Sequence, residues 1–468
     1  MGKGRGKHGA GKRGGNKAGA DKSRADKDGT SEARAVKRGS QTGDSGKVKG
    51  GAASKASFPA KSLTTVLDPG PPLSDGDLPK VAIVILNYNG LHHLEGCFES
   101  LRAMDYPREL VEVVLVDNGS SDDSVETVRR RWPWVNLVAN PRNVGFSAGC
   151  NQGAQAADDP ALYVFLNNDM RVEPTWLREL VGPVVRGECV AATAKMLSWD
   201  GKLMNSAGGG MNFHGIGIQK GYLVKPGPEH DVPTRTLFAC GGAMAVDADV
   251  FREVGGFDEE FFAYYEDVDL GWRMWVQGHE VHYAPRAVCY HHHSSTSRTF
   301  PIETVRLLQT RNPVLACFKN YDDDHLRQVM PAMFGLFLRR MLVVAGIEDS
   351  GPYRIERAEP RSHGVVGRLF DRARHAVQDT QGVRRVCAAD LIGINDFLGN
   401  WDHWMARRTE VQAKRRRPDA EIFTLFHKPG WCIEDEPGYR QLHEGLAQFM
   451  GLDRLFDGLE AEGAEPHR

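Results

Sequence analysis

The sequence predicts an α/β fold with a mostly parallel sheet flanked by helices, a helical C-terminal extension and a disordered basic N-terminal tail. Short apolar runs alternate with stretches of helical periodicity between residues 80 and 320. Strands that alternate with helices along a chain form parallel sheets with right-handed crossovers. A polar loop also follows each apolar run, and the composition changes near residue 80. The 468 residues suffice for one large or two medium domains.

Four apolar runs are predicted to be strands. Residues 81–86 and 111–116 are almost continuously apolar, which is typical of strands that are buried on both faces. Residues 135–139 and 162–166 predict two shorter strands. Helices are expected between them, through residues 94–101, 122–131 and 148–157.

The first 79 residues are predicted to be a disordered tail and linker. Residues 1–61 hold sixteen Lys or Arg and five Asp or Glu, a net charge of +11. With few apolar side chains, this segment cannot bury enough surface to offset the entropy of ordering its backbone. A tail that contacts anionic lipid or nucleic acid by charge and a merely solubilising leader both fit this composition. No apolar segment follows the charges, so a secretory signal is not expected.

Cysteine usage and hydropathy favour a cytoplasmic protein without membrane-spanning helices. The eight cysteines are scattered singly, without C-x-x-C or metal-site spacing, which is typical of reduced, mostly buried thiols. No run of eighteen uncharged apolar residues occurs. The nearest candidate, residues 330–347, is interrupted by Arg339 and Arg340. A helix in a membrane interface and an ordinary core helix both fit this segment.

Two nucleotide-binding fingerprints are absent. The pattern G-x-G-x-x-G does not follow the first predicted strand, which argues against a dinucleotide-binding dehydrogenase. The pattern G-x-x-x-x-G-K-[ST] is also missing, which argues against a P-loop nucleotidase. A nucleotide bound to this sheet would therefore need a metal ion to carry its diphosphate.

The ends of the predicted strands indicate one ligand site. Tyr88, Asp117, Asn143 and Asp169 each stand at or just after a strand end. In open α/β sheets, ligands bind outside the carboxyl ends of the strands. Each loop alone has ordinary turn chemistry, but four in succession at one edge predict that these side chains converge on one crevice.

Residues 261–273 supply the candidate catalytic groups. Glu266, Asp267 and Asp269 stand at the start of an amphipathic run, which suits the N-terminus of a helix. A carboxylate held in a partly apolar place can act as a general base, and helix capping is the alternative. Asp269 is interpreted as a helix-start residue.

A series of motifs occurs here in the same order as in a known family. The motifs are Val84-Ile-Leu-Asn-Tyr-Asn-Gly90, Val116-Asp-Asn-Gly-Ser-Ser-Asp122, Asn140-Pro-Arg-Asn-Val-Gly-Phe146, Phe165-Leu-Asn-Asn-Asp169, Cys240-Gly-Gly-Ala-Met-Ala245, Val254-Gly-Gly-Phe-Asp258, Tyr265-Glu-Asp-Val-Asp269 and Tyr290-His-His-His293. Over about residues 81–320 they resemble glycosyltransferase family 2, in its rhamnosyltransferase-like branch. Arg311-Asn312 looks like the Arg-Asn pair found past the catalytic domain of that family, and residues 415–422 resemble the tail of its longer members.

The resemblance implies a Rossmann-like GT-A fold, an inverting mechanism and a nucleotide-sugar donor with a dTDP, UDP or GDP group. Asp117 would hold the base or the ribose of the donor, and Tyr88 would flank the base. Further donor-binding candidates in these motifs are Asn89, Asn143, Gly145 and Asn168.

The resemblance also implies a site for Mg²⁺ or Mn²⁺. Asn167-Asn-Asp169 stands where the family carries its DXD motif, with the neutral Asn167 in place of the first carboxylate. Asp169 is the main protein ligand expected, because carboxylate oxygens suit these hard cations. His291 or His292 would complete the site, with a solvated loop histidine as the alternative.

For the acceptor side, the resemblance assigns the general base to Asp267, while Glu266 orients the acceptor or Asp267. Gly241 and Gly242 would let the acceptor approach the backbone closely, or they form a plain turn. The Q-x-x-R-W signature of the processive membrane synthases is absent. Addition of one or a few sugars from the cytosolic side is therefore expected.

Together these patterns predict a tail and linker over residues 1–79, a GT-A catalytic domain over 80–320 and a helical extension over 321–468. The expected activity is transfer of a sugar, with rhamnose indicated by the branch, to a glycan or lipid-linked glycan in polysaccharide or cell-envelope biosynthesis. A peripheral contact at the inner face of the membrane is compatible with this activity, and no nucleic-acid partner is expected. Two alternatives stay open: a non-catalytic protein of this fold that acts on membrane or nucleic acid through its tail, and a nucleotidyltransferase.

Overall fold

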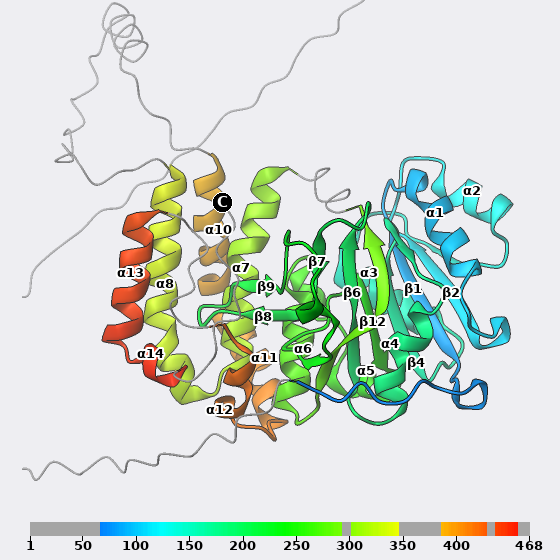
Figure 1. Cartoon of the computed structure of the whole chain (residues 1–468). Coiled ribbons are helices and arrows are strands. Elements are labelled where there is room, and N and C mark those ends of the chain that lie inside the picture. The colour runs from blue at the N-terminus through cyan, green and yellow to red at the C-terminus, as the bar shows by residue number, and fades with distance from the viewer. Residues whose placement is uncertain (1–65, 293–300, 346–384, 428–435, 457–468) are drawn as a thin grey trace, which may run out of the picture. The chain divides into compact units, whose positions relative to one another are not determined.

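The computed structural model describes residues 66–292, 301–345, 385–427 and 436–456, so residues 1–65 of the tail and linker predicted over residues 1–79 lie outside them. Its main sheet has the order β10-β12-β6-β11-β4-β1-β2-β3, with β5 on β12 and β7 on β6. Figure 1 shows this sheet with helices on both of its faces. The α/β class predicted from the sequence is confirmed.

The half of the sheet that the sequence predicted is parallel. β1 pairs with β2 and with β4, and β2 pairs with β3, all in parallel register. The four strands are β1 (Val81–Asn87), β2 (Val111–Asp117), β3 (Asn136–Ala139) and β4 (Leu162–Asn167). Their carboxyl ends therefore meet at one edge, as expected.

The other half makes the sheet mixed rather than mostly parallel. β11 pairs antiparallel with both β4 and β6, while β12 runs parallel to β6. The strands beyond β4 are β5 (Met170–Val172), β6 (Ala191–Ser198), β7 (Met204–Ser206), β10 (Thr234–Arg235), β11 (Ala243–Asp247) and β12 (Val281–His291). A separate hairpin is formed by β8 (Gly209–Met211) and β9 (Gly217–Gln219). Several of these strands are only two or three residues long, too short to show a period in the sequence.

Helices cover the two faces of the sheet in two core clusters. The helices of the sheet region are α1 (Leu91–Arg102), α2 (Ser124–Arg131), α3 (Phe146–Ala156), α4 (Trp176–Val185), α5 (Ala248–Val254) and α6 (Glu266–Val276). Side chains of α1, α2 and α4 share one cluster with Ile83 and Ile85, whereas those of α3, α5 and α6 share the other with Ala82 and Val84. Alternate residues of β1 thus serve opposite cores, which explains its continuous apolar sequence.

Two glycines let α3 pack directly on the sheet. A Cβ atom on Gly149 would lie 2.4 Å from the Leu86 side chain, and one on Gly153 would lie 2.3 Å from Val84. Because glycine has no side chain at either position, the helix can approach β1 closely. This approach places the N-terminus of α3, at Phe146, beside the ends of the parallel strands.

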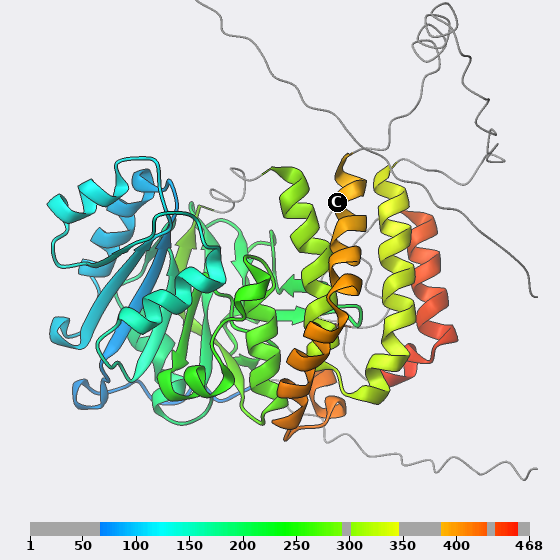
Figure 2. The ribbon, with the colours of Figure 1, turned by 180° about the vertical axis from the view of Figure 1, so that it is seen from behind.

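The C-terminal region is helical, as predicted. Its helices are α7 (Ile302–Asn320), α8 (Asp323–Ala345), α10 (Arg385–Gly399), α11 (Trp401–Ala413), α12 (Asp419–Ile422), α13 (Pro437–Phe449) and α14 (Leu452–Leu455). Short 3₁₀ turns complete the described structure at Asp75–Asp77, Arg108–Leu110, Pro228–Asp231, Glu259–Phe261 and Phe423–Leu425. Figure 2 shows α7, α8, α10 and α13 as neighbouring, roughly parallel rods.

The long helical stretch that begins at Ile302 is interrupted between α7 and α8. The chain turns at Tyr321, whose backbone is extended, and Asp322 accepts a hydrogen bond from the backbone N–H of His325. The apolar face of α8 is buried through Ala332, Met333, Leu336 and Phe337. Most of the segment 330–347 is therefore a core helix rather than a helix lying in a membrane interface.

The boundary predicted at residue 320 is not marked by a gap in the core. Side chains of α7, α8, α11 and α13 belong to the same cluster as Trp272 and Trp275 of α6. The division into a catalytic domain and an extension stays a prediction. Among the described residues, no helix is long and apolar enough to cross a membrane. Six cysteines are free: Cys97, Cys150, Cys189, Cys240, Cys289 and Cys317.

Candidate active site

A cavity of about 490 Å³ lies at the carboxyl ends of β1, β2 and β4, where the sequence places its polar loops. This volume is in the usual range for a small-molecule site. Of the fourteen predicted site residues, eleven line it: Tyr88, Asn143, Gly145, Asn167, Asn168, Asp169, Gly241, Gly242, Glu266, Asp267 and His291. Asn89, Asp117 and His292 are not among the lining residues.

Asn87 ties three strand ends together, and sequence reasoning missed it. Its side-chain amide donates to Asp117 Oδ2 at 2.9 Å, and its Oδ1 accepts a hydrogen bond from Asn168 Nδ2 at 2.8 Å. The side chain is fully buried at the end of β1. An Asn closing a buried strand looks like ordinary turn chemistry, so no signal in the sequence separated it from its neighbours.

Asp117 and Asn89 hold the loops together rather than facing the cavity. The second oxygen of Asp117 accepts a hydrogen bond from the backbone N–H of Ser120 at 2.9 Å. Asn89, with a positive φ of 52°, accepts a hydrogen bond from the backbone N–H of Ser121 at 2.7 Å. Both residues therefore fix the β2–α2 loop beside Tyr88. Their contact with a donor stays a prediction.

Asn118 is a second buried amide that the sequence did not single out. It donates to Asn143 Oδ1 at 2.9 Å and to the carbonyl oxygen of Gly145 at 3.0 Å, so it fixes the loop before α3. Gly145 has a φ of 93°, and a Cβ atom there would lie 2.6 Å from Phe262. Only glycine combines this conformation with this contact.

Asp169 and His291 come together although 121 residues separate them in the sequence. Antiparallel pairing of β5 with β12 places His291 opposite Met170. His291 Nε2 lies 3.2 Å from Asp169 Oδ1, and its Nδ1 lies 2.8 Å from Asn205 Oδ1. When Asn205 Oδ1 accepts a hydrogen bond from Nδ1–H, the tautomer is fixed and Nε2 carries its lone pair on the side of Asp169. Asn205 is thus a supporting residue that no motif in the sequence singled out.

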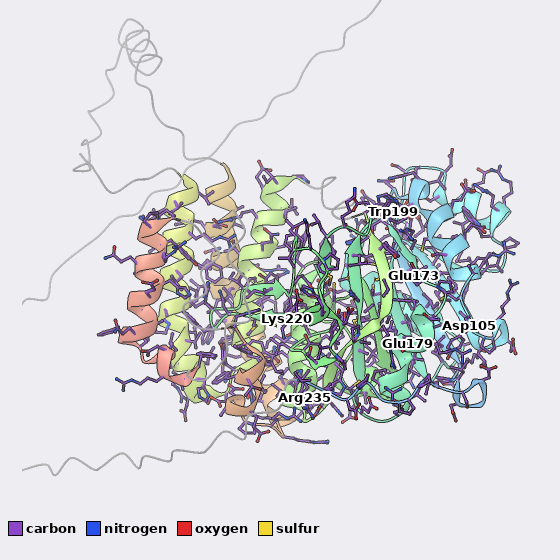
Figure 3. The ribbon with its side chains drawn as sticks, in the orientation of Figure 1. Asp105, Glu173, Glu179, Trp199, Lys220 and Arg235 are labelled. Carbon is purple, nitrogen blue, oxygen red and sulfur yellow. The ribbon has the colours of Figure 1, made fainter. Side chains whose placement is uncertain are left out.

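His292 turns away from the cavity. Its ring stacks on Trp199 with centroids 3.7 Å apart, and it lies 5.2 Å from the ring of His93. Figure 3 labels Trp199 near the tops of β6 and α1. Of the two histidines predicted for a metal site, His291 is the one beside Asp169, and the adjacent His293 lies outside the described residues.

Glu266 and Asp267 begin α6, and both line the cavity. Asp267 Oδ2 accepts a hydrogen bond from the backbone N–H of Gly241 at 3.1 Å, and Oδ1 accepts one from Val268 at 2.8 Å. Glu266 is buried, and its Oε2 has no hydrogen-bond partner in the described part of the chain. Gly241 thus orients Asp267, whereas the sequence predicted only an acceptor-binding role for Gly241.

The two carboxyl groups differ in what stabilises their charge. Burial, together with the neighbouring Asp267, raises the pKa of Glu266 to about 8. Burial also raises the pKa of Asp267, but hydrogen bonds from Gly241 and Val268 favour its carboxylate and oppose the shift. When two such groups share a site, the better solvated one carries the charge. Glu266 is therefore the protonated partner near neutral pH, and Asp267 is the carboxylate.

Protonation of Glu266 makes stability depend on pH. The folded chain holds this proton up to about pH 8, whereas the unfolded chain releases it near the usual value of 4.5. Stability from this group is therefore full below the usual value and declines as the pH rises toward 8. We expect Glu266→Gln to raise Tm relative to the wild type more at pH 8 than at pH 5, measured by calorimetry. The exposed Glu126→Gln is the control, and an equal Tm difference at both pH values would contradict the assignment.

Asp269 stands in the first turn of α6, as its interpretation as a helix-start residue expects, and it also has a structural role that the sequence did not show. Its carboxylate is fully buried and accepts hydrogen bonds from Arg273 at 2.8 Å, Lys319 at 2.9 Å and Asn320 at 3.0 Å. It thus joins α6 to α7. The sequence could not show this link, because the partners on α7, Lys319 and Asn320, lie 50 and 51 residues away.

In the described part of the chain, one group of three side chains is close enough to hold a metal ion by acidic and imidazole atoms: Asp322, His325 and Asp419. None of them lines the cavity. Asp419 already accepts hydrogen bonds from Arg415 at 2.7 Å and from the backbone N–H of Asp322 at 2.7 Å. This group is satisfied as a structural link between the α7–α8 turn and α12.

Comparison with known proteins identifies the class. Residues 82–255 match the family model described as glycosyl transferase family 2, and residues 230–331 match that of glycosyl transferase family group 2. These segments contain the whole sheet and all the cavity residues named above. The fold and the site therefore define a glycosyltransferase with a GT-A fold. The chain belongs to glycosyltransferase family 2.

Two curated relatives show how far the similarity extends. The chain is 31% identical over 229 residues to the O-antigen biosynthesis protein RfbC of Myxococcus xanthus, covering 47% of this chain and 18% of that protein. It is 29% identical over 240 residues to the N-acetylglucosaminyl-diphospho-decaprenol L-rhamnosyltransferase of Mycobacterium tuberculosis, covering 46% of this chain and 77% of the relative. Among solved structures, a mannosyltransferase from Pyrobaculum calidifontis in complex with GDP-Man and Mn²⁺ matches 74% of this chain and 91% of its own, with 16% identity and a TM-score of 0.42.

Proposed function

We propose that this glycosyltransferase is metal-dependent and inverting, and that it moves a sugar from a nucleoside-diphosphate donor to a glycan or lipid-linked glycan. The observation that carries the proposal is the arrangement of the cavity. The Asp169–His291 pair, the buried Glu266 and the half-buried Asp267 all line it. A transferase needs two such groups, one for the leaving diphosphate and one for the attacking hydroxyl.

The donor is proposed to lie along the ends of β1, β2 and β4. Tyr88 would flank the base, while Asn143, Gly145 and Asn168 would shape the adjoining wall. Asn118 and Asn87 hold that wall through buried hydrogen bonds, so it is preorganised. Amide and backbone donors of this kind bind phosphate and sugar oxygens without a glycine-rich cradle.

The donor set at Asp169 fits Mg²⁺ or Mn²⁺. A buried carboxylate, an imidazole nitrogen oriented by Asn205 and the amide oxygen of Asn167 are available on one wall. A bound divalent cation would stabilise the negative charge that develops on the departing diphosphate. Asp169 and His291 would hold it, with Asn167 as a weaker, neutral ligand.

Asp267 is proposed to take the proton from the acceptor hydroxyl. It is the ionised member of the pair, and Gly241 and Val268 hold its two oxygens in place. Glu266, protonated, can donate a hydrogen bond to the acceptor or to Asp267. Attack from the face opposite the diphosphate would invert the anomeric centre.

A donor screen tests the proposal. Purified protein with Mn²⁺ or Mg²⁺ would be given UDP-, dTDP- and GDP-sugars, and release of nucleoside diphosphate would be scored with and without EDTA. We expect release from one donor that EDTA abolishes and excess Mn²⁺ restores. Release that EDTA leaves unchanged would overturn the metal dependence, and calorimetry with free nucleotides would separate a missing acceptor from a protein that binds no donor.

Removing the metal ligand is expected to have a large effect. Asp169→Asn should lower release of nucleoside diphosphate by about 10²-fold or more, because it weakens the binding of the cation that would stabilise the departing diphosphate. Asn205→Ala should lower Mn²⁺ affinity by about 10–100-fold, because it frees the His291 ring. Asp200→Asn, at an exposed surface pair with Lys202, is the matched control. Wild-type Mn²⁺ affinity in Asp169→Asn would remove Asp169 from the site.

The relatives make particular substrates the first to test. One is named for O-antigen biosynthesis and another as an L-rhamnosyltransferase that acts on a decaprenyl diphosphate. A dTDP-rhamnose donor, a lipid-linked acceptor, a role in cell-envelope polysaccharide synthesis and a place at the cytoplasmic face of the membrane are proposals on this basis. The matched region spans 18% of the first relative, so the acceptor of this chain has to be determined on this chain itself.

A further inference from the structure

The segment before the Glu266–Asp267 pair has a strained backbone. Phe262, Tyr264 and Tyr265 have φ values of 61°, 67° and 70°, a region that residues other than glycine rarely adopt. Phe262 has a ψ of −61°, and the N–H of Ala263 donates to the carbonyl of Phe261 at 2.7 Å. This is a γ-turn of the rare form with positive φ. Such conformations persist only where the surroundings hold them.

Four carbonyl oxygens of this loop, those of residues 261–264, accept hydrogen bonds from outside it. The oxygen of Phe262 accepts hydrogen bonds from the backbone N–H groups of Phe146 and Ser147, at the start of α3. The oxygens of Phe261, Ala263 and Tyr264 lie 3.0, 3.0 and 2.7 Å from one atom, Asn312 Nδ2. One side-chain amide of α7 therefore gathers three carbonyls of the strained loop.

The orientation of that amide is fixed by its neighbour. Arg311 Nε donates to Asn312 Oδ1 at 3.1 Å, so the oxygen is engaged and the NH₂ group must face the loop. Arg311 also donates to the carbonyl oxygen of Glu260 at 2.6 Å and pairs with Asp396 of α10 at 3.2 Å. Asn312 is fully buried. The contacts thus run from α10 through α7 to the loop.

We propose that Asn312 is a positioning residue for the transfer reaction, and that Arg311 orients it. By holding residues 261–265 in their strained conformation, Asn312 places Glu266 and Asp267 at the wall of the cavity. The C-terminal helices are then part of the catalytic apparatus rather than a separate appendage. This inference rests on the proposed function for its kinetic test, and a second test is independent of it.

The kinetic test compares Asn312→Leu with a matched variant on the same helix. Asn312→Leu keeps the size of the side chain and removes the amide group that contacts three carbonyls of the loop. Thr310 stands two residues before Asn312 on α7. Thr310→Val removes the buried hydrogen bond from Thr310 to Asp390 and leaves the contacts of the loop intact. We expect Asn312→Leu to lower kcat by about 10²-fold, the usual cost of misplacing a reacting group by about 1 Å, with little change in KM for the donor. Thr310→Val should keep the wild-type kcat, and Arg311→Met should lower kcat less than Asn312→Leu.

The independent test is limited proteolysis with chymotrypsin, which cleaves after Phe and Tyr. Release of the loop should speed cleavage at residues 261–265 in Asn312→Leu and Arg311→Met, but not in Thr310→Val. Equal kcat and equal cleavage in Asn312→Leu and Thr310→Val would overturn the inference. If the wild type transfers no sugar, the proposed function fails and the cleavage pattern still decides the role of Asn312. If Asn312→Leu does not fold, Arg311→Met gives the same two readouts.

Discussion

Asp267→Asn is expected to lower kcat for sugar transfer by about 10²–10⁴-fold, the usual contribution of a positioned general base. The substitution keeps the size of the side chain and an oxygen that can accept the hydrogen bond from Gly241 or Val268. It removes the negative charge that would take the proton. Transfer is to be measured at saturating donor and acceptor, so that kcat is read directly.

The control for this variant is a second aspartate at the start of a helix. Asp247 caps α5 by accepting from Val250 at 2.9 Å, and it does not line the cavity. Asp247→Asn should keep the wild-type kcat. Donor affinity of Asp267→Asn, measured by calorimetry, should also be unchanged, because Asp267 is proposed to act on the acceptor. Undiminished transfer by Asp267→Asn would remove this residue from the mechanism.

Lys319→Met is expected to destabilise the protein by about 3–5 kcal/mol, the range for removing one partner of a buried ion pair. Lys319 Nζ lies 2.5 Å from Asp258 Oδ2 and 2.9 Å from Asp269 Oδ2, and all three side chains are buried. Burial raises the pKa of Asp258, but the charges of Lys319, Arg273 and Arg407 outweigh it and leave that pKa well below its usual value. Asp258 is therefore charged, and the variant would leave each aspartate with fewer partners.

Urea denaturation followed by tryptophan fluorescence measures this effect, because Trp272 and Trp275 are buried in α6 beside the network. The control is Lys80→Met, which breaks an exposed pair with Asp158 of similar length, 2.7 Å. Solvent screens such surface pairs, so only a small shift of the midpoint is expected. If the two variants shift the midpoint equally, the network of Lys319 does not stabilise the fold in the way its burial implies.

The sequence could predict the parallel half of the sheet because that half follows local rules. Continuous apolar runs marked strands that are buried on both faces, and the polar residues after them marked the ligand edge. Asp169 and the Glu266–Asp267 pair stand out because several carboxylates and amides cluster in short, ordered motifs. Each of these signals depends only on residues within about ten positions of one another.

The antiparallel strands and the division between α7 and α8 could not be predicted in the same way. β11 is covered by neighbours on both sides, and its residues carry no period that distinguishes a central antiparallel strand from a buried helix segment. The turn at Tyr321 is stabilised by contacts with α12, about 97 residues further along the chain. Local preference does not record such a partner.

By itself, the sequence determined the fold class, the edge of the sheet where the site lies and most of the side chains that line it. Only the tertiary structure decided which of them meet: His291 rather than His292 beside Asp169, and Gly241 on Asp267. It also supplied the buried amides of Asn87, Asn118 and Asn312 and the ion pairs of Asp269. The physical reason is that the role of a buried polar group depends on its hydrogen-bond partners, and those partners lie far away in the chain. The reactive side chains stand in short sequence motifs, whereas their positions in the site depend on contacts that form only when the chain folds.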